Sequence, residues 1–193
     1  MGQLILVTGG ARSGKSSFAE KLAASFGREV VYLATAQALD TEMEQRITKH
    51  RLSRPAEWRT VEEPLEIPRA VLAEGDGKKV ILLDCVTLWL TNLLILELEN
   101  NQAGDVEEKI QNKLAELIEV IERQDTILIC VSNEVGLGVV PENDLARVYR
   151  DLAGRANQRL GRAAQQVYLV TAGYPMEVKQ QGSKILRELE GDR

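Results

Sequence analysis

The sequence predicts a single α/β domain in which a mostly parallel sheet is flanked by helices on both faces. Short apolar runs, typical of buried strands, alternate with amphipathic segments along the chain, and this alternation favours parallel strands joined by crossover helices. The first run leads into a glycine-rich loop and a helix, and a later run ends in an aspartate. The 193 residues suffice for one domain with a sizeable core, so we expect one domain spanning residues 1–193.

The glycine-rich loop at 9–16 is the most specific motif in the chain. It fits the phosphate-loop pattern G-x-x-x-x-G-K-[ST], with a strand expected at 4–8 and a helix at 16–26. Glycines let backbone N–H groups point at a phosphate, Lys15 adds charge for the β- and γ-phosphates, and the Ser16 hydroxyl can bind Mg²⁺. The alternative is a glycine-rich turn without a ligand. The predicted nucleotide-binding residues of the loop are Gly9, Gly10, Ala11, Arg12, Ser13, Gly14, Lys15 and Ser16.

Composition argues against several classes of protein. The net charge of −5 and the aromatic fraction of 4% count against a nucleic-acid-binding surface. No apolar run reaches the ~18 residues of a membrane span, and the N-terminus lacks a secretory signal pattern. Cys85 and Cys130 lie at or near the ends of apolar runs. We expect buried thiols there, as in a reducing cytosol, and hence a cytoplasmic protein.

A second strand is expected at 29–34, and small residues follow it directly. Thr35 and Ala36 stand at its carboxyl end. Because ligands of open α/β sheets bind at the carboxyl ends of strands, we expect these two positions at the ligand edge.

The apolar run at 79–84 ends in Asp84 and resembles a Walker B strand. In such a strand, the terminal carboxylate reaches Mg²⁺ or its waters. We expect this strand to lie beside the strand that precedes the phosphate loop. The alternative is a strand that stops at a solvated aspartate. Mg²⁺ is therefore the expected cofactor, with Ser16 and Asp84 as its ligands.

The other elements are expected from local patterns. A capping box at Thr41 and Glu44 starts a helix that ends before Pro55, since the residue before a proline avoids the helical region. The run 86–98 is apolar on almost every side, so we expect a buried helix covered partly by another subunit. The remaining expected elements are a short strand at 58–61, helices at 64–75, 106–123 and 143–164, and strands at 126–131 and 167–171, the last of which is broken at Gly173 and Pro175 before a short tail.

His50 is the only histidine, and cations surround it in the sequence. At helical spacing Arg46, His50 and Arg54 share one side. Neighbouring cations keep an imidazole neutral, and a neutral imidazole is a nucleophile. A cation cluster also costs repulsion unless an anion binds. His50 is thus a candidate nucleophile towards a nucleotide phosphate that the arginines hold. The alternative is a solvated basic face with acidic neighbours.

Six blocks of the sequence carry a resemblance to a known family, at 8–16, 32–36, 46–62, 82–89, 132–141 and 150–158. They resemble the bifunctional adenosylcobinamide kinase / adenosylcobinamide-phosphate guanylyltransferase of cobalamin synthesis. The resemblance spans most of the chain, apart from a linker near residue 101 and the tail after residue 179. It implies a RecA-like fold and a homotrimer.

The resemblance implies two reactions. In one, ATP or GTP phosphorylates the aminopropanol hydroxyl of adenosylcobinamide. In the other, GMP passes from GTP to the product through a phosphoramidate on His50, giving adenosyl-GDP-cobinamide and pyrophosphate. His50 and Lys15 are the implied catalytic residues. Outside the phosphate loop, the implied nucleotide-binding residues are Ala34, Thr35, Ala36, Arg51, Leu52, Ser53, Arg54, Glu62 and Asp84.

Several alternatives stay open at this point. Glu134 follows a predicted strand and could act as a general base, or it could belong to a turn built on Gly136 and Gly138. Arg147 and Arg150 could reach the corrinoid or only solvent. For the whole chain, the alternatives are a plain small-molecule kinase without a covalent intermediate and a non-catalytic nucleotide switch of RecA type.

Overall fold

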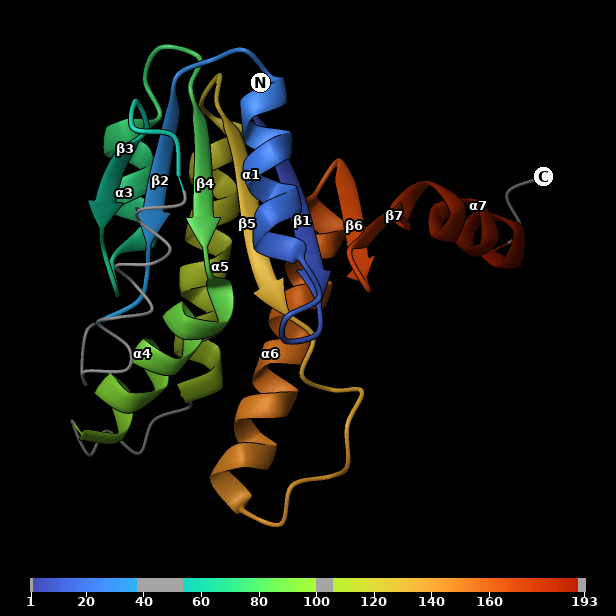
Figure 1. The fold of residues 1–193 in the computed structure, drawn as a ribbon. Coiled ribbons are helices and arrows are strands. Elements are labelled where there is room, and N and C mark those ends of the chain that lie inside the picture. The colour runs from blue at the N-terminus through green and yellow to red at the C-terminus, as the bar shows by residue number, and fades with distance from the viewer. Residues whose placement is uncertain (1, 38–53, 100–105, 191–193) are drawn as a thin grey trace.

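The fold is known from a computed structural model, which describes residues 2–37, 54–99 and 106–190 (Figure 1). The helix expected after Thr41 lies outside the described residues. So do four of the predicted site residues, namely His50, Arg51, Leu52 and Ser53.

A seven-stranded sheet runs through the molecule. Its strands are β1 (Gln3–Gly9), β2 (Val30–Ala34), β3 (Arg59–Glu62), β4 (Val80–Asp84), β5 (Ile127–Asn133), β6 (Gln166–Thr171) and β7 (Tyr174–Glu177). They are arranged in the order β3-β2-β4-β5-β1-β6-β7. Every neighbouring pair is parallel except β6 and β7. The parallel strands therefore end together, at the lower edge of the sheet in Figure 1.

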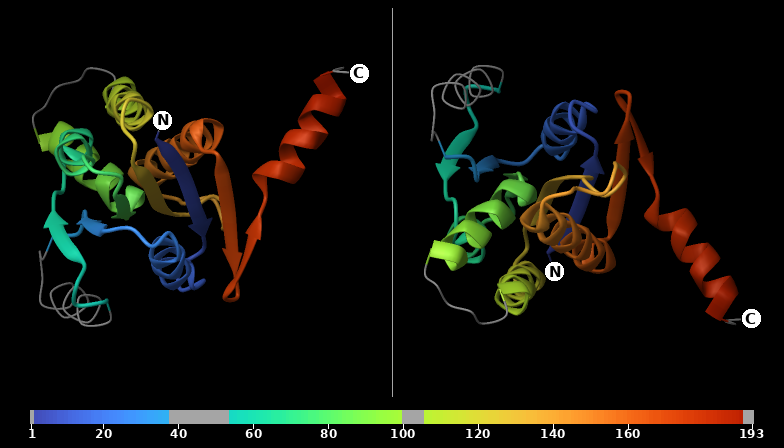
Figure 2. Two further views of the ribbon diagram at one scale, coloured as in Figure 1. Left: turned by 90° about the horizontal axis from the view of Figure 1, so that it is seen from above. Right: turned by 90° about the horizontal axis from the view of Figure 1, so that it is seen from below.

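Helices cover both faces of this sheet, as predicted. They are α1 (Lys15–Ser25), α3 (Ile67–Glu74), α4 (Val86–Glu99), α5 (Val106–Glu122), α6 (Asp144–Ala163) and α7 (Lys179–Glu190). Helix α1 lies on one face, and α3, α5 and α6 lie on the other (Figure 2). Helix α7 projects from the body of the molecule beside β7 (Figures 1 and 2).

The two faces have separate cores, because successive residues of a strand point to opposite sides. In β1, Leu4 and Leu6 pack towards α5 and α6, whereas Ile5 and Val7 pack towards α1. All four side chains are at most 2% exposed. A strand buried on both faces reads as a continuous apolar run, which is why the sequence identified these strands clearly.

The expected neighbour of the phosphate-loop strand was wrong. Strand β4 pairs with β2 and β5, and β5 lies between β4 and β1. Strands buried on both faces carry the same apolar pattern, so their residues do not specify which two lie side by side. Asp84 therefore ends a strand that is two positions away from β1.

The expected end of the sheet was also wrong. A two-residue turn at Ala172 and Gly173 returns the chain into β7, which pairs antiparallel with β6. Both turn residues have positive φ, 51° and 85°, as the tight turn of a hairpin requires. Pro175 is tolerated because β7 is an edge strand. The tail then continues as the 12-residue helix α7 instead of a short irregular segment.

Helix α4 is buried along its first half and exposed at its end. Val86, Trp89 and Leu90 are fully buried, whereas Ile95 and Leu98 are 44% and 48% exposed. The cover by another subunit that the sequence suggested remains a prediction. Within the described residues, no helix combines the length and apolar character that crossing a membrane demands.

Candidate functional site

The phosphate loop joins the end of β1 to the start of α1. Gly14, with a φ of 93°, precedes the first helical residue, and no side chain caps the helix. A Cβ atom at Gly9 would lie 2.4 Å from the carbonyl oxygen of Val170, so only glycine fits there. The first turn of α1 thus keeps backbone N–H groups for a ligand, as anion-binding helix termini do.

Lys15 lies inside the loop. Its side chain is 8% exposed, and its Nζ donates to the carbonyl oxygen of Gly10 at 3.2 Å. The Ser13 Oγ is buried and has no hydrogen-bond partner among the described residues. A buried polar atom without a partner is uncommon in a folded protein. The loop therefore contains a buried positive charge and a buried hydroxyl, both of which suit a bound phosphate.

The ends of neighbouring strands form one row at the carboxyl edge of the sheet. Ala34 of β2 pairs with Glu62 of β3 on one side and with Asp84 of β4 on the other. On β1, Gly9 pairs with Asn133 of β5. The structure therefore brings Ala34, Glu62, Asp84 and the phosphate loop to one edge of the sheet, where the sequence expected the ligand.

Thr35 reaches the same edge, but its side chain serves the backbone. It is fully buried, and its Oγ1 both accepts from the N–H of Cys85 and donates to the Cys85 carbonyl, each at 2.9 Å. The Asn92 amide donates to the Thr35 carbonyl at 2.9 Å. Thr35 thus fixes the corner where β2 and β4 end, and its hydroxyl is already occupied.

Two residues that the sequence analysis did not assign lie next to Asp84. The Tyr32 hydroxyl donates to Oδ2 of Asp84 at 2.8 Å. The Arg54 guanidinium lies over the Tyr32 ring, with its Cζ 3.2 Å from the ring centroid. Glu20, on α1, is half-buried and close enough to Asp84 and Arg54 to interact with their charges. Its place one helical turn after Ser16 was the available sequence signal.

These neighbours perturb the ionisation of Glu20 and Tyr32. Burial raises the pKa of the Glu20 carboxyl, Arg54 opposes that rise, and Asp84 adds to it. Burial also raises the pKa of the Tyr32 hydroxyl, and the Asp84 charge raises it further. Tyr32 therefore stays protonated and donates to Asp84 throughout the physiological range.

The donor set at this edge fits Mg²⁺. Tyr32 occupies one oxygen of the Asp84 carboxylate, and no hydrogen bond from another described residue reaches Oδ1. The part of the chain that the structure describes holds no group of three or more His, Cys, Asp or Glu side chains fit to cage a metal. Mg²⁺ needs no such cage, because it binds one or two protein ligands together with phosphate oxygens and water. Ser16 and Asp84 are the residues that would hold it.

The loop after β5 contacts the phosphate loop through its backbone. The N–H of Glu134 donates to the Gly9 carbonyl at 2.9 Å, and the Glu134 carboxylate accepts from the N–H of Gly136 at 2.8 Å. In this structure the Glu134 side chain therefore closes a turn. Arg147 donates to the carbonyl oxygen of Pro141 at 2.8 Å, and Arg150 pairs with Asp151 at 3.2 Å.

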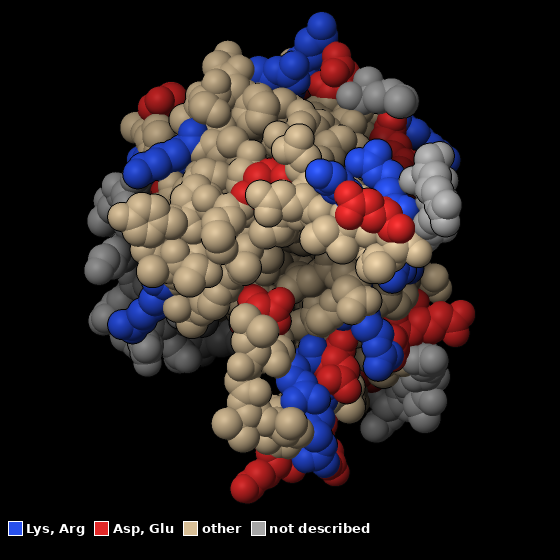
Figure 3. Space-filling view, turned by 90° about the vertical axis from the view of Figure 1, so that its right-hand side faces the viewer, with Lys and Arg blue, Asp and Glu red and all other residues tan. Residues whose placement is uncertain are grey.

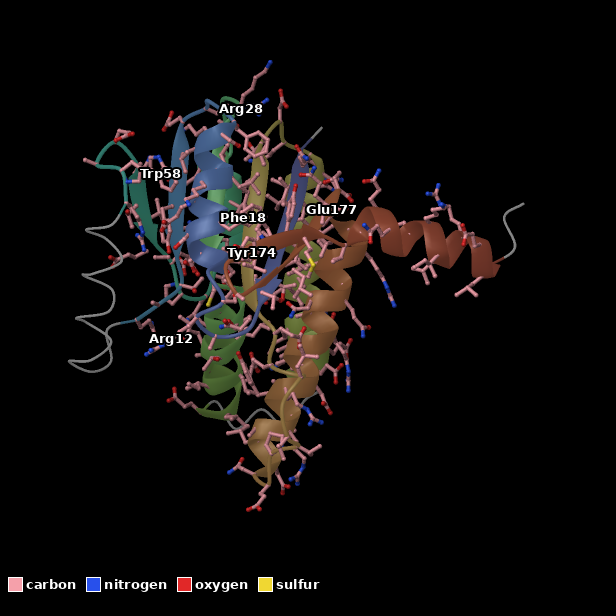
Figure 4. The ribbon with its side chains drawn as sticks, turned by 45° about the vertical axis from the view of Figure 1, so that its right-hand side comes forward. Arg12, Phe18, Arg28, Trp58, Tyr174 and Glu177 are labelled. Atoms are coloured by element: carbon pink, nitrogen blue, oxygen red, sulfur yellow. The ribbon has the colours of Figure 1, made fainter. Side chains whose placement is uncertain are left out.

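Charged side chains lie at both ends of α1 and on the side of β7 (Figures 3 and 4). Arg12 projects at the carboxyl edge, while Arg28 lies beyond the other end of α1 (Figure 4). On the face seen from the side of β7, Lys and Arg are interspersed with Asp and Glu (Figure 3).

Comparison with known proteins places the sequence among enzymes of one pathway. A family model described as cobinamide kinase / cobinamide phosphate guanyltransferase matches residues 5–178. The bifunctional adenosylcobalamin biosynthesis protein CobP of Pseudomonas aeruginosa is 45% identical over 174 residues, which cover 90% of this chain and 96% of that protein. The proteins named CobU of Escherichia coli and Salmonella typhimurium are 43% and 45% identical, and the matches cover 91% of this chain and 99% of each relative.

Among solved structures, the fold is similar to the ATP synthase subunit NeqB of Nanoarcheaum equitans. The TM-score is 0.57, and the match covers 87% of this chain and 45% of that chain at 14% identity. At this identity the likeness concerns the fold alone. It confirms the predicted α/β fold class.

Proposed function

The chain belongs to the cobinamide kinase / cobinamide phosphate guanyltransferase family, and from this membership we propose that both reactions use the nucleotide site at the carboxyl edge of the sheet. The chain is a kinase and nucleotidyltransferase of adenosylcobalamin synthesis. We propose adenosylcobinamide and its phosphate as acceptors, with ATP or GTP as donor in the first step and GTP in the second.

One observation carries this proposal. The phosphate loop, with its buried Lys15, and the Asp84 carboxylate lie at the same edge of the sheet. A triphosphate whose β- and γ-phosphates lie in the loop would have its metal within reach of Asp84. The glycine-constrained loop and the uncapped start of α1 support the same placement.

In the kinase step, the aminopropanol hydroxyl of the corrinoid attacks the γ-phosphorus of the donor. The bond between that phosphorus and the β,γ-bridging oxygen breaks, the nucleoside diphosphate leaves, and the hydroxyl proton passes to a base or to solvent. Lys15 holds the β- and γ-phosphates during the transfer. Mg²⁺, when bound by Ser16 and Asp84, supplies charge neutralisation for the phosphate oxygens.

In the second reaction, His50 is the proposed nucleophile. A neutral ring nitrogen attacks the α-phosphorus of GTP, and pyrophosphate leaves. A phosphate oxygen of adenosylcobinamide phosphate then attacks the guanylyl phosphorus, and the phosphorus–nitrogen bond breaks. Adenosyl-GDP-cobinamide forms and His50 is regenerated. Arg51 and Arg54 would hold the triphosphate, and Glu62 and the residues at the end of β2 would contact other parts of the nucleotide.

A radiolabel experiment tests the covalent step. The protein is mixed with Mg²⁺ and GTP labelled at the α-phosphate, denatured, and examined for label that stays on the chain. We expect an acid-labile, alkali-stable adduct in the wild type and none in His50→Ala. The absence of an adduct, with γ-label passing to a small molecule, would favour the plain kinase.

The kinase step gives a second readout on the same variant. We expect His50→Ala to keep measurable phosphorylation of adenosylcobinamide, because the phosphate loop and Asp84 are unchanged. An equal loss of both activities would mean that His50 positions the triphosphate and does not attack it.

The assembly and location that we propose rest on the family resemblance. We propose a cytoplasmic homotrimer, with the exposed end of α4 at Ile95, Leu96 and Leu98 as part of the subunit contact. Light scattering on the purified protein tests the trimer. A monomer at micromolar concentration would contradict it.

A further inference from the structure

Tyr32 connects two parts of the site, the carboxylate of Asp84 and the guanidinium of Arg54. Its side chain is 2% exposed and packs in the core on the α1 side of the sheet. Its hydroxyl contacts Asp84, and its ring contacts Arg54. One rigid side chain, fixed by the core, therefore touches both the metal carboxylate and an arginine of the nucleotide-binding segment.

The hydroxyl contact sets the orientation of the metal carboxylate. A hydrogen bond of 2.8 Å from Tyr32 engages Oδ2 of Asp84, and hydrogen bonds to charged acceptors are among the stronger ones. With Oδ2 engaged, the other carboxylate oxygen is available to a metal or its water. Outer partners of this kind orient metal ligands, and their loss weakens metal binding.

The ring contact holds Arg54, which follows His50 by four residues in the sequence. Arg54 is the first residue of the described range 54–99. Its guanidinium lies 3.2 Å from the Tyr32 ring centroid, which is a cation–π arrangement. The Nε of Arg54 is buried and has no hydrogen-bond partner among the described residues. A donor thus remains for an anionic oxygen, while the ring fixes the plane of the guanidinium.

Resting on the proposed function, we propose that Tyr32 is a positioning residue with two separable effects. Its hydroxyl orients Asp84 for the metal that both reactions use. Its ring holds the Arg54 guanidinium, which in the proposed function binds the triphosphate for guanylyl transfer. Removing the hydroxyl therefore affects both reactions equally, whereas removing the ring also changes their ratio.

Two substitutions separate the effects. Tyr32→Phe keeps the ring and loses the hydrogen bond, and Tyr32→Leu loses both. Tyr168→Phe is a matched control, because Tyr168 lies on β6 with its ring 5.0 Å from that of Phe18, away from the Asp84 contact. Three readouts are taken: the Mg²⁺ dependence of binding of a fluorescent GTP analogue, the kcat and KM of the kinase step, and the single-turnover rate of guanylyl-enzyme formation.

For Tyr32→Phe, we expect the Mg²⁺ concentration at half-maximal GTP binding to rise about fivefold or more, since the Asp84 carboxylate loses its partner. The ratio of guanylyl transfer to phosphorylation should stay within about twofold, as an aromatic ring still faces Arg54. For Tyr32→Leu, we expect the same metal shift and a ratio about tenfold lower. Tyr168→Phe should change neither quantity.

A further variant guards against simple loss of fold. Arg54→Lys keeps the charge but loses the planar group that stacks on the ring. We expect Arg54→Lys to lower the ratio of guanylyl transfer to phosphorylation as Tyr32→Leu does. The double variant Tyr32→Leu/Arg54→Lys should lower this ratio no further, because both substitutions break the same contact. Thermal unfolding of each variant shows whether the fold is kept.

The inference is overturned if Tyr32→Phe leaves the metal dependence unchanged, if Tyr32→Leu lowers both reactions by the same factor, or if the double variant shows additive losses. A wild-type protein that forms no guanylyl-enzyme would contradict the proposed function instead. In that case the metal dependence of Tyr32→Phe still decides whether Tyr32 orients Asp84.

Discussion

Helices α1 and α7 both follow a strand, but their first turns are used in opposite ways. At α1, Gly14 precedes the helix and no side chain caps it. At α7, the Glu177 carboxylate accepts the backbone N–H groups of Lys179 and Gln180 at 3.1 and 2.9 Å. The first helix therefore keeps its N-terminal donors for a ligand, whereas the last helix satisfies them within the chain.

The two helices also differ in how they pack. Ala19 and Ala23 of α1 are fully buried against the sheet, while Leu189 of α7 is 78% exposed. The family match ends at residue 178, directly before α7. Helix α1 therefore belongs to the part of the chain that the family model matches, whereas α7 lies outside that part and is attached through Glu177 and Lys179.

The largest effect is expected for Lys15→Ala. The substitution removes the charge that the loop holds near Gly10. We expect both activities to fall by about 100-fold or more, the scale seen when a preorganised charge-stabilising group is lost. Steady-state assays of both reactions measure the fall. Lys21→Ala on the exposed side of the same helix is the control, and an equal loss there would contradict a special role for Lys15.

A smaller effect is expected for Gly14→Ala, which tests the N-terminus of α1, where no side chain caps the helix. The φ of 93° is strained for alanine, and the new Cβ would lie 3.2 Å from the Cα of Gly173. Strain of this kind costs about 1–3 kcal/mol, so GTP should bind about tenfold or more weakly, as titration calorimetry would show. Gly27→Ala is the matched control, because its φ of 60° is also strained for alanine while the residue lies beyond the other end of α1, outside the phosphate loop.

The capping of α7 by the Glu177 carboxylate predicts that the stability of this helix depends modestly on pH. Burial tends to raise the pKa of Glu177, but hydrogen bonds from the N–H groups of Gln180, Val167 and Lys179 outweigh it and lower the pKa. Because the folded-state pKa is depressed, the stabilising contribution is present above the unfolded pKa of about 4.3 and is lost as pH falls through the folded value. Circular dichroism at 222 nm should show helix loss on acidification below about pH 4.

Glu177→Gln is the control for that experiment, since glutamine does not titrate in this range. The variant should lose the acid-dependent part of the helix signal. If wild type and variant gave the same pH profile, Glu177 would not be the group that holds α7.

The smallest effect on the site is expected from deletion of residues 180–193. Lys179 is kept because its Nζ donates to carbonyls at the end of α6, among them those of Gly161 and Arg162. Since the rest of α7 lies outside the matched family region, GTP affinity should stay within about twofold of the full chain. A large loss of GTP affinity would contradict the contrast between α1 and α7, and would mean that α7 contributes to the nucleotide site.

The sequence predicted the structure correctly where that structure depends on residues that are close together in the chain. The phosphate loop, with its flanking strand and helix, was predicted because its pattern is local. Asp84 was correctly expected at the carboxyl edge, because parallel strands end together. The neighbours of β4 were not predicted, since buried strands share one apolar pattern. Tyr32 and Glu20 were missed because their proximity to Asp84 arises from the β2–β4 pairing and the packing of α1.

The place of β1 within the sheet has a consequence for how the chain is made. Its two partners are residues 127–133 and 166–169, so β1 has no neighbour to pair with until synthesis has passed β5. The pairing of β1 thus depends on contacts between residues that are far apart in the sequence. A nascent chain should acquire GTP affinity only after β5 has emerged, and nucleotide cannot guide its earlier folding.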